Sequence, residues 1–169
     1  MKQAIYKLAA SIVFIAFACG VASAKGFDEY GISFSYPTDW HITENSDSDD
    51  TQLISVEKEG IESSGMVAMQ TLNKIYDIDS FVDAFRDSMA NNGVFDDLEF
   101  SSVTSGAYGH YSCDTFSYSM SVMGIPHHGR IYIIDDSDRY VIIMEQEADE
   151  DRAVNATGFD AIRTSLTLQ

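Results

Sequence analysis

The sequence predicts an α+β fold, with a mainly antiparallel sheet of about six to seven strands flanked by helices. Several short segments alternate apolar and polar residues, which is the period of a strand. Other segments repeat apolar residues at helical spacing. Two strands in the second half of the chain are apolar on both faces. Such strands lie in the centre of a sheet, so we expect a helix on each side of it.

The first expected strand is residues 31–36, where isoleucine, phenylalanine and tyrosine alternate with serine. Pro37 has no backbone N–H to donate to a neighbouring strand and therefore ends it. A short polar turn then leads to Trp40, whose large ring we expect to anchor the core.

Three further strands are expected before the first helix. The sequence predicts a short strand at residues 41–43, followed by an acidic loop at 44–50. Strands at 53–57 and 66–72 follow, and the glycines and serines of residues 59–65 mark a hairpin connection between them. These segments form the first block of strands.

Residues 78–91 predict an amphipathic helix. Its apolar stripe consists of Ile78, Phe81, Val82, Phe85 and Met89. Asp77 is suited to cap the N-terminus, because a short acidic side chain accepts hydrogen bonds from the first free N–H groups. Gly93 follows the stripe and is expected to end the helix.

A second block of strands follows the helix. We expect strands at 98–103, 108–122, 130–134 and 140–144, with turns at 124–129 and 135–138. The last two strands are apolar on both faces. One face of the long strand carries a row of small polar side chains, which either receives a partner or lies open to solvent: Thr115, Ser117, Ser119 and Ser121.

The C-terminal segment predicts the second helix. Its apolar stripe is Ala153, Ala156, Phe159, Ile162 and Leu166. Acidic residues 149–151 precede it, where the helix dipole favours negative charge. Gly158 lowers the helix propensity, so we place the start of the regular helix near Asn155.

Residues 1–24 have the pattern of a secretory signal peptide. Two lysines precede an apolar run, and small residues close it. We expect cleavage between Ala24 and Lys25, which leaves residues 25–169 as a single exported domain. The expected location is the periplasm or the extracellular space.

The two cysteines raise the question of a lipid anchor. Cys19 lies in the signal, and lipoproteins are cut before an acylated cysteine. Phe17 is bulky where a lipoprotein signal has a small residue, which favours the soluble form over lipidation at Cys19. Cys113 is then the single thiol of the mature domain, so no internal disulfide forms, and we expect Cys113 to be buried.

The net charge of -17 limits the class of partner. Such an excess of acid disfavours nucleic acid and anionic membrane surfaces, whose phosphates would be repelled. It favours cations and basic proteins. An acidic surface that is merely solvated would have the same composition.

The segment Tyr30-Gly-Ile-Ser-Phe-Ser-Tyr-Pro-Thr-Asp-Trp40 resembles the opening of PsbP-like domains, which include bacterial envelope proteins similar to DcrB. The order of hairpin, helix, long hairpins and final helix agrees over residues 25–169. The resemblance implies an α/β/α sandwich around an antiparallel sheet. It also implies a non-catalytic accessory or binding factor for another protein. Because DcrB-like members are often lipoproteins, the resemblance leaves lipidation at Cys19 as an alternative.

A metal-binding protein is the alternative function. His110, together with His127 or His128 and a nearby carboxylate, would supply nitrogen and oxygen ligands for zinc or copper. Adjacent histidines on an extended strand point in opposite directions, so His127 and His128 would not chelate one ion together. The acidic turn 135–138 offers oxygen ligands for weak calcium binding but lacks the glycine and final glutamate of a calcium loop.

A hydrolase with an unrecognised site is the third reading. The sequence contains no Gly-x-Ser-x-Gly elbow. No glycine-rich phosphate loop occurs either, and we expect no cofactor and no catalytic residue.

Overall fold

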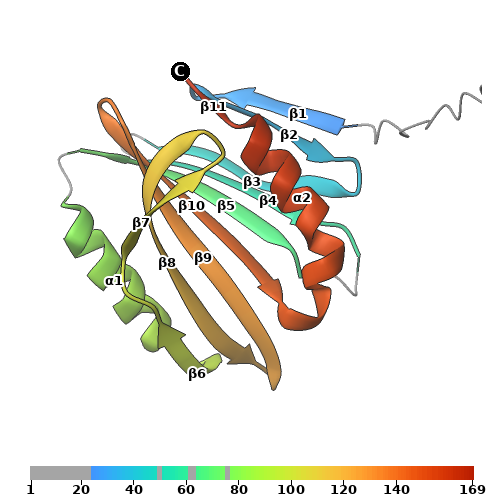
Figure 1. Ribbon diagram of the computed structural model, residues 1–169, viewed down its shortest axis with the longest axis vertical. Helices are drawn as coiled ribbons and strands as arrows, with labels where there is room; N and C mark the ends of the chain where they lie inside the picture. The colour runs from blue at the N-terminus through green and yellow to red at the C-terminus, as the bar shows by residue number, and fades with distance from the viewer. Residues whose placement is uncertain (1–23, 49–50, 61–63, 75–76) are drawn as a thin grey trace, which may run out of the picture.

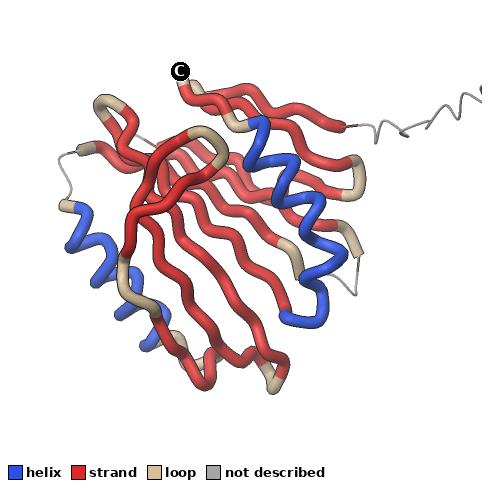
Figure 2. The backbone as a smooth tube through the Cα atoms, viewed as in Figure 1, coloured by secondary structure: helices blue, strands red, loops and turns tan. Residues whose placement is uncertain are grey.

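The computed structural model describes residues 24–48, 51–60, 64–74 and 77–169 (Figure 1). Two helices and two antiparallel sheets form the domain, which confirms the predicted α+β class (Figure 2). The expected signal peptide and Cys19 lie outside the described residues, apart from Ala24 at the cleavage site. No helix in the described ranges has the length and apolarity to cross a membrane.

The larger sheet has eight strands in the order β3-β4-β5-β10-β9-β8-β6, with β7 paired to β8. Its strands are β3 (Trp40–Ser48), β4 (Thr51–Lys58), β5 (Met66–Asn73), β6 (Phe95–Phe100), β7 (Thr104–Tyr108), β8 (Tyr111–Val122), β9 (Ile125–Asp136) and β10 (Arg139–Ala148). The smaller sheet has the order β1-β2-β11 and consists of β1 (Ala24–Glu29), β2 (Ile32–Pro37) and β11 (Thr167–Leu168).

Helix α1 (Ile78–Ala90) covers one face of the larger sheet, close to the predicted range. Asp77 caps it as expected: its Oδ2 accepts a hydrogen bond from the Ser80 backbone N–H at 3.1 Å. The core on this side joins Val82 and Met89 of α1 to apolar side chains of β8, β9 and β10: Phe116, Tyr118, Met120, Ile131, Ile133 and Ile142.

Helix α2 (Arg152–Ser165) and the smaller sheet cover the opposite face (Figure 1). A 3₁₀ turn (Asp149–Asp151) leads into α2. The helix begins before Asn155, so the later start expected from Gly158 is wrong. Gly158 is instead packed against Trp40, which is 1% exposed and is the core anchor that the sequence predicted.

The central strands β9 and β10 are buried on both faces, as their sequences predicted. Tyr132, Ile134, Val141 and Ile143 belong to the core under α2. Their neighbours at alternate positions belong to the core under α1. A helix on each face of the sheet follows from this alternation.

Several strand boundaries differ from the prediction. Residues 44–48 continue β3 instead of forming an acidic loop. β9 begins at Ile125, inside the predicted turn 124–129, because Met123 and Gly124 alone make the turn with positive φ angles of 53° and 83°. β6 ends at Phe100, so residues 101–103 are not part of the expected strand 98–103.

Three strands were not predicted. β1 and β11 are the edges of the smaller sheet, and β7 pairs only with β8. The long strand predicted at 108–122 is divided at Gly109, whose φ of 60° makes the turn between β7 and β8. These strands are polar or short, and they form because they are hydrogen-bonded to β2 or β8, which their own sequences do not indicate.

Candidate functional site

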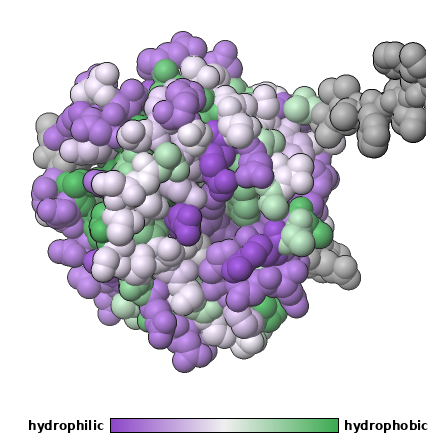
Figure 3. All heavy atoms as spheres, in the orientation of Figure 1, coloured by the Kyte–Doolittle hydropathy of each residue, from purple (hydrophilic) through white to green (hydrophobic). Residues whose placement is uncertain are grey.

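A pocket of about 310 Å³ opens between β9, β10 and α2. Strongly hydrophilic side chains lie alongside α2 on this face of the molecule (Figure 3). The wall includes Ser117 of β8, His128, Arg130 and Tyr132 of β9, Glu145 and Glu147 of β10, and Arg152, Ala156, Phe159, Asp160 and Arg163 of α2.

Strand geometry brings the β-sheet side of the pocket together. Alternate residues of a strand share a face, so Glu145 and Glu147 continue the α2-facing row of Val141 and Ile143. In the pairing of β9 with β10, His128 lies opposite Glu147 and Arg130 lies opposite Glu145. The strands therefore place charged residues where the apolar row ends.

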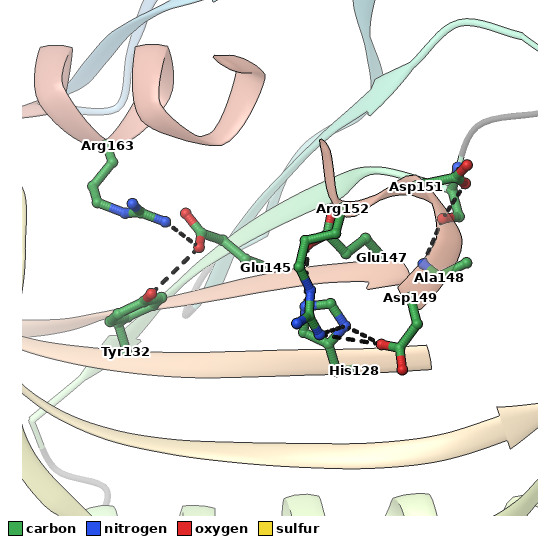
Figure 4. A network of polar contacts seen from close by, with 10 residues as sticks. His128, Tyr132, Glu145, Glu147, Ala148, Asp149, Asp151, Arg152 and Arg163 are labelled. Carbon is green, nitrogen blue, oxygen red and sulfur yellow. Dashed lines mark hydrogen bonds and ion pairs between the residues drawn. The ribbon is translucent and has the colours of Figure 1, made fainter. Parts of the chain in front are cut away.

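Glu145 is the centre of one polar cluster (Figure 4). The residue is 7% exposed, and its Oε2 accepts hydrogen bonds from Arg163 Nη2 at 2.6 Å and from the Tyr132 hydroxyl at 3.3 Å. Burial raises the pKa of Glu145, and the positive charge of Arg163 opposes that rise. Burial and the nearby Glu145 charge also raise the pKa of the Tyr108 hydroxyl.

His128 is the centre of the second cluster. Its Nε2 lies 3.1 Å from Glu147 Oε1, and its Nδ1 lies 2.7 Å from Asp149 Oδ1 (Figure 4). Arg152 Nη2 lies 3.3 Å from the same Asp149 oxygen. The imidazole thus connects the buried Glu147 of β10 to the ion pair of Asp149 and Arg152 at the start of α2.

The corner between β10 and α2 is fixed by Asp151. Its Oδ2 accepts hydrogen bonds from the backbone N–H of Ser64 at 3.0 Å and from the Ser64 hydroxyl at 2.8 Å. The Ala148 N–H donates to the same hydroxyl oxygen at 2.5 Å (Figure 4). This arrangement determines where Asp149 and Arg152 stand relative to the pocket.

The two buried glutamates each have one unpaired oxygen. Glu147 is 5% exposed and Glu145 is 7% exposed. Glu145 Oε1 and Glu147 Oε2 are buried and have no hydrogen-bond partner within the described ranges. Each of the two glutamates thus keeps one acceptor oxygen that no described group satisfies.

The structure does not bring the three predicted histidine ligands together. His110 lies in the turn between β7 and β8, while His128 pairs with Ser119, eight positions along β8 from Tyr111. At the rise of a strand this is a separation of roughly 26 Å. His127 points away from His128, and its Nδ1 contacts the Ile125 carbonyl at 3.0 Å. Among the described residues, no group of three potential ligands is placed to hold a metal ion.

The acidic turn proposed for calcium is engaged by cations of the chain itself. Lys74 forms an ion pair with Asp135, and Arg139 Nε lies 3.0 Å from Asp136 Oδ2. Arg139 also donates to the carbonyl oxygens of Tyr30 at 2.8 Å and Gly31 at 3.2 Å. The turn therefore fastens the smaller sheet to the larger one.

The structure also shows the surroundings of the remaining residues that the sequence analysis singled out. Cys113 is a free, buried cysteine, as expected, and burial raises the pKa of its thiol. Of the small polar row on β8, Ser117 lines the pocket and Thr115 donates to the Ile131 carbonyl at 2.7 Å. Lys25, at the expected cleavage site, donates to the Trp40 carbonyl at 2.9 Å.

Sequence reasoning missed the pocket residues Glu145, Glu147 and Arg163. A signal was present, because the acids occupy the same alternate positions as Val141 and Ile143 and thus continue a buried face. No sequence signal indicated which arginine would meet them, since α2 lies on that face only in the folded chain.

No family model matches the chain, and a search of the curated proteins finds no match. Solved structures do resemble it. The solution structure of cyanobacterial PsbP (CyanoP) from Synechocystis sp. PCC 6803 has a TM-score of 0.60 and 12% identity, covering 90% of this chain and 96% of that one.

Two further structures are similar over much of the chain. A protein from Bacteroides thetaiotaomicron VPI-5482 has a TM-score of 0.51 and 14% identity, covering 82% of this chain and 45% of that one. LpqN of Mycobacterium tuberculosis, described as involved in cell envelope biogenesis, has a TM-score of 0.47 and 12% identity, covering 87% of this chain and 91% of that one. By its match to the cyanobacterial structure, the chain has the PsbP-like fold.

Proposed function

We propose that the chain is an exported, non-catalytic accessory protein of the cell envelope that binds a basic protein partner. The observation that carries this proposal is the PsbP-like fold, which extends over 90% of the chain. The family resemblance implies an accessory role, and the signal pattern of residues 1–24 supports export. The net charge of -17 supports a partner that presents lysine or arginine.

The partner is tested by affinity capture with the chain from Lys25 onward. The tagged protein is incubated with solubilised envelope and, separately, with cytosolic extract, and bound proteins are identified by mass spectrometry. We expect one basic envelope protein to be enriched and to be released as the salt concentration rises. Recovery of no specific partner at low salt would reject the accessory role.

The mature N-terminus is tested independently of the partner. Mass spectrometry of the protein from its native host is expected to give a chain beginning at Lys25. A diacylated or triacylated peptide beginning at Cys19 would instead show that the domain is anchored to a membrane by lipid.

A hydrolase is the second candidate, and one observation favours it. Burial raises the pKa of Glu145 inside a pocket that also contains Tyr132 and Arg163, and shifted acids in pockets are typical of acid–base catalysis. The test is a panel of chromogenic esters, glycosides and peptides. Turnover that disappears in Glu145→Gln would favour the hydrolase over the accessory protein.

A further inference from the structure

The buried polar atoms at the inner wall of the pocket are incompletely paired, and they include Arg163 Nε and one oxygen of each glutamate. Glu145 Oε2 is bonded to Arg163 and Tyr132, and Glu147 Oε1 contacts His128, but Glu145 Oε1 and Glu147 Oε2 have no partner among the described residues. Buried carboxylate oxygens without a donor are unfavourable, so a ligand that supplies one gains the energy of a charge-assisted hydrogen bond.

The two arginines of α2 that line the pocket each form an ion pair with an aspartate. Arg163 Nη1 lies 3.0 Å from Asp160 Oδ1 in addition to its bond to Glu145. Arg152 is paired with Asp149 at the entrance. In these ion pairs neither arginine binds Glu145 Oε1 or Glu147 Oε2.

We propose that this pocket receives a primary ammonium group of the partner protein, from a lysine side chain or from a chain N-terminus. This inference rests on the proposed function, because it specifies where the basic partner is held. It assigns the pocket between β9, β10 and α2 as the point of recognition, with Glu145 and Glu147 as the acceptors.

The spacing of the acceptors favours an ammonium over a guanidinium. Glu145 and Glu147 are two positions apart on one strand, which separates their backbones by roughly 7 Å. A guanidinium is a planar fork suited to both oxygens of one carboxylate, whereas an ammonium is a compact charge with donors in several directions. The ammonium can therefore bridge oxygens that belong to two different carboxylates.

The rest of the pocket fits the chain that carries such a group. Ala156 and Phe159 line it and offer apolar surface to the methylenes of a lysine stem. Arg130 is exposed and also lines the pocket, where its donors can bind the carbonyl oxygens that flank the ammonium in a peptide.

The test uses three small probes and nuclear magnetic resonance. Acetyl-lysine methylamide presents the side-chain ammonium, glycyl-glycinamide presents an N-terminal ammonium, and acetyl-norleucine methylamide has the lysine stem without its charge. Each is titrated into the labelled protein while the amide signals of Gly129 and Ala156 are followed. We expect the first, the second or both to shift these signals with saturation, and the third to leave them unchanged.

The variants separate the pocket from the general acidity of the protein. Glu147→Gln keeps the side-chain size but removes a charge, and it is expected to weaken ammonium binding at least about tenfold. Glu145→Gln is the second pocket variant in case the first does not fold. Asp83→Asn removes the same charge from the exposed surface of α1, on the other side of the sheet, and is expected to bind as the parent does.

Binding by the lysine probe alone identifies a side chain as the source, and binding by the dipeptide alone identifies a chain N-terminus. Failure of both charged probes, equal binding of the norleucine probe, or an equal loss in Asp83→Asn would overturn the inference. Undiminished capture of an envelope partner by Glu147→Gln would overturn it while leaving the accessory role intact. Probe binding without any captured partner would support the ammonium site and reject the accessory role.

Discussion

Gly158 of α2 lies directly against the indole ring of Trp40 in β3. A methyl carbon at Gly158 would stand 2.2 Å from Trp40 Cζ2 and 2.6 Å from its Nε1. The same indole and the Phe159 ring are inclined at 74°, with the ring centroids 5.5 Å apart. The glycine thus allows α2 to settle onto the sheet, close enough for its charged side to reach the pocket.

Gly158→Ala is therefore expected to lower the free energy of unfolding by about 2–3 kcal/mol, because the added carbon overpacks the core. Urea denaturation measures the change. Gly93→Ala is the matched control, since no atom lies within 4 Å of the added carbon there. Equal stabilities of the two variants would show that α2 does not depend on contact with Trp40.

Met123→Asn is expected to raise the free energy of unfolding by about 0.5–1 kcal/mol, because asparagine tolerates a left-handed conformation better than methionine. Met123 has a φ of 53° in a two-residue hairpin turn and is 91% exposed, so it loses little packing. Thermal unfolding followed by circular dichroism measures the gain. Val94→Asn is the control, because Val94 is also an exposed apolar residue but does not have a positive φ angle. An equal gain in Val94→Asn would refute the explanation from the backbone conformation of Met123.

Glu145→Gln is expected to change how stability depends on pH. The pKa of Glu145 in the folded protein is raised above its ordinary value of 4.5, mainly by burial. As pH rises from the pKa of Glu145 in the unfolded chain to its higher pKa in the folded protein, the unfolded chain releases the proton first. The parent therefore loses stability over this interval, whereas the glutamine variant does not.

The measurement is urea denaturation of both proteins between pH 4 and 8, at about one-unit steps across the interval that a raised carboxyl pKa covers. The stability of the parent relative to Glu145→Gln should fall as pH rises and then level off. Glu99→Gln, on the exposed side of β6, controls for the loss of a charge. A relative stability that increased with pH would contradict a raised pKa.

The thiol of Cys113 is expected to react slowly with a disulfide reagent in the folded protein. The side chain is buried, and burial raises the pKa of the thiol and so reduces the reactive thiolate. Labelling in urea should be at least about a hundredfold faster, since it then needs no opening of the core. Fast labelling without denaturant would place Cys113 at the surface.

The strongest sequence patterns predicted the fold best. Helix α1 has a full apolar stripe and a capping aspartate at Asp77, and β5 has uninterrupted strand character, so both were found within one residue at each end. The edge of β3 at residues 44–48 is exposed and polar, and only its pairing with β4 makes it a strand. Local preference cannot reveal a strand whose hydrogen bonds come from elsewhere in the chain.

The pocket was harder to predict than the fold. Glu145 and Glu147 could be assigned to a buried face by counting alternate positions from Ile143. Arg163 and His128 join them from α2 and β9, and only the packing of those elements brings them near. Of the three histidines that the sequence suggested as ligands, His110 lies in the turn between β7 and β8, whereas His127 and His128 lie in β9 and point to opposite faces. The types of residue in a sequence carry no information about strand register, so this separation could not be predicted.

The pairing of β2 with β11 has a consequence for how the chain is assembled. Ile32 lies opposite Leu168, and the Ser35 N–H donates to the Ser165 hydroxyl at 2.8 Å. Because a chain is synthesised from its N-terminus, the early residues Phe34 and Trp40 must wait for residues 152–169 before they can be buried. Residues 152–169 thus close the core, and a chain that lacked them would expose that core to proteases and chaperones.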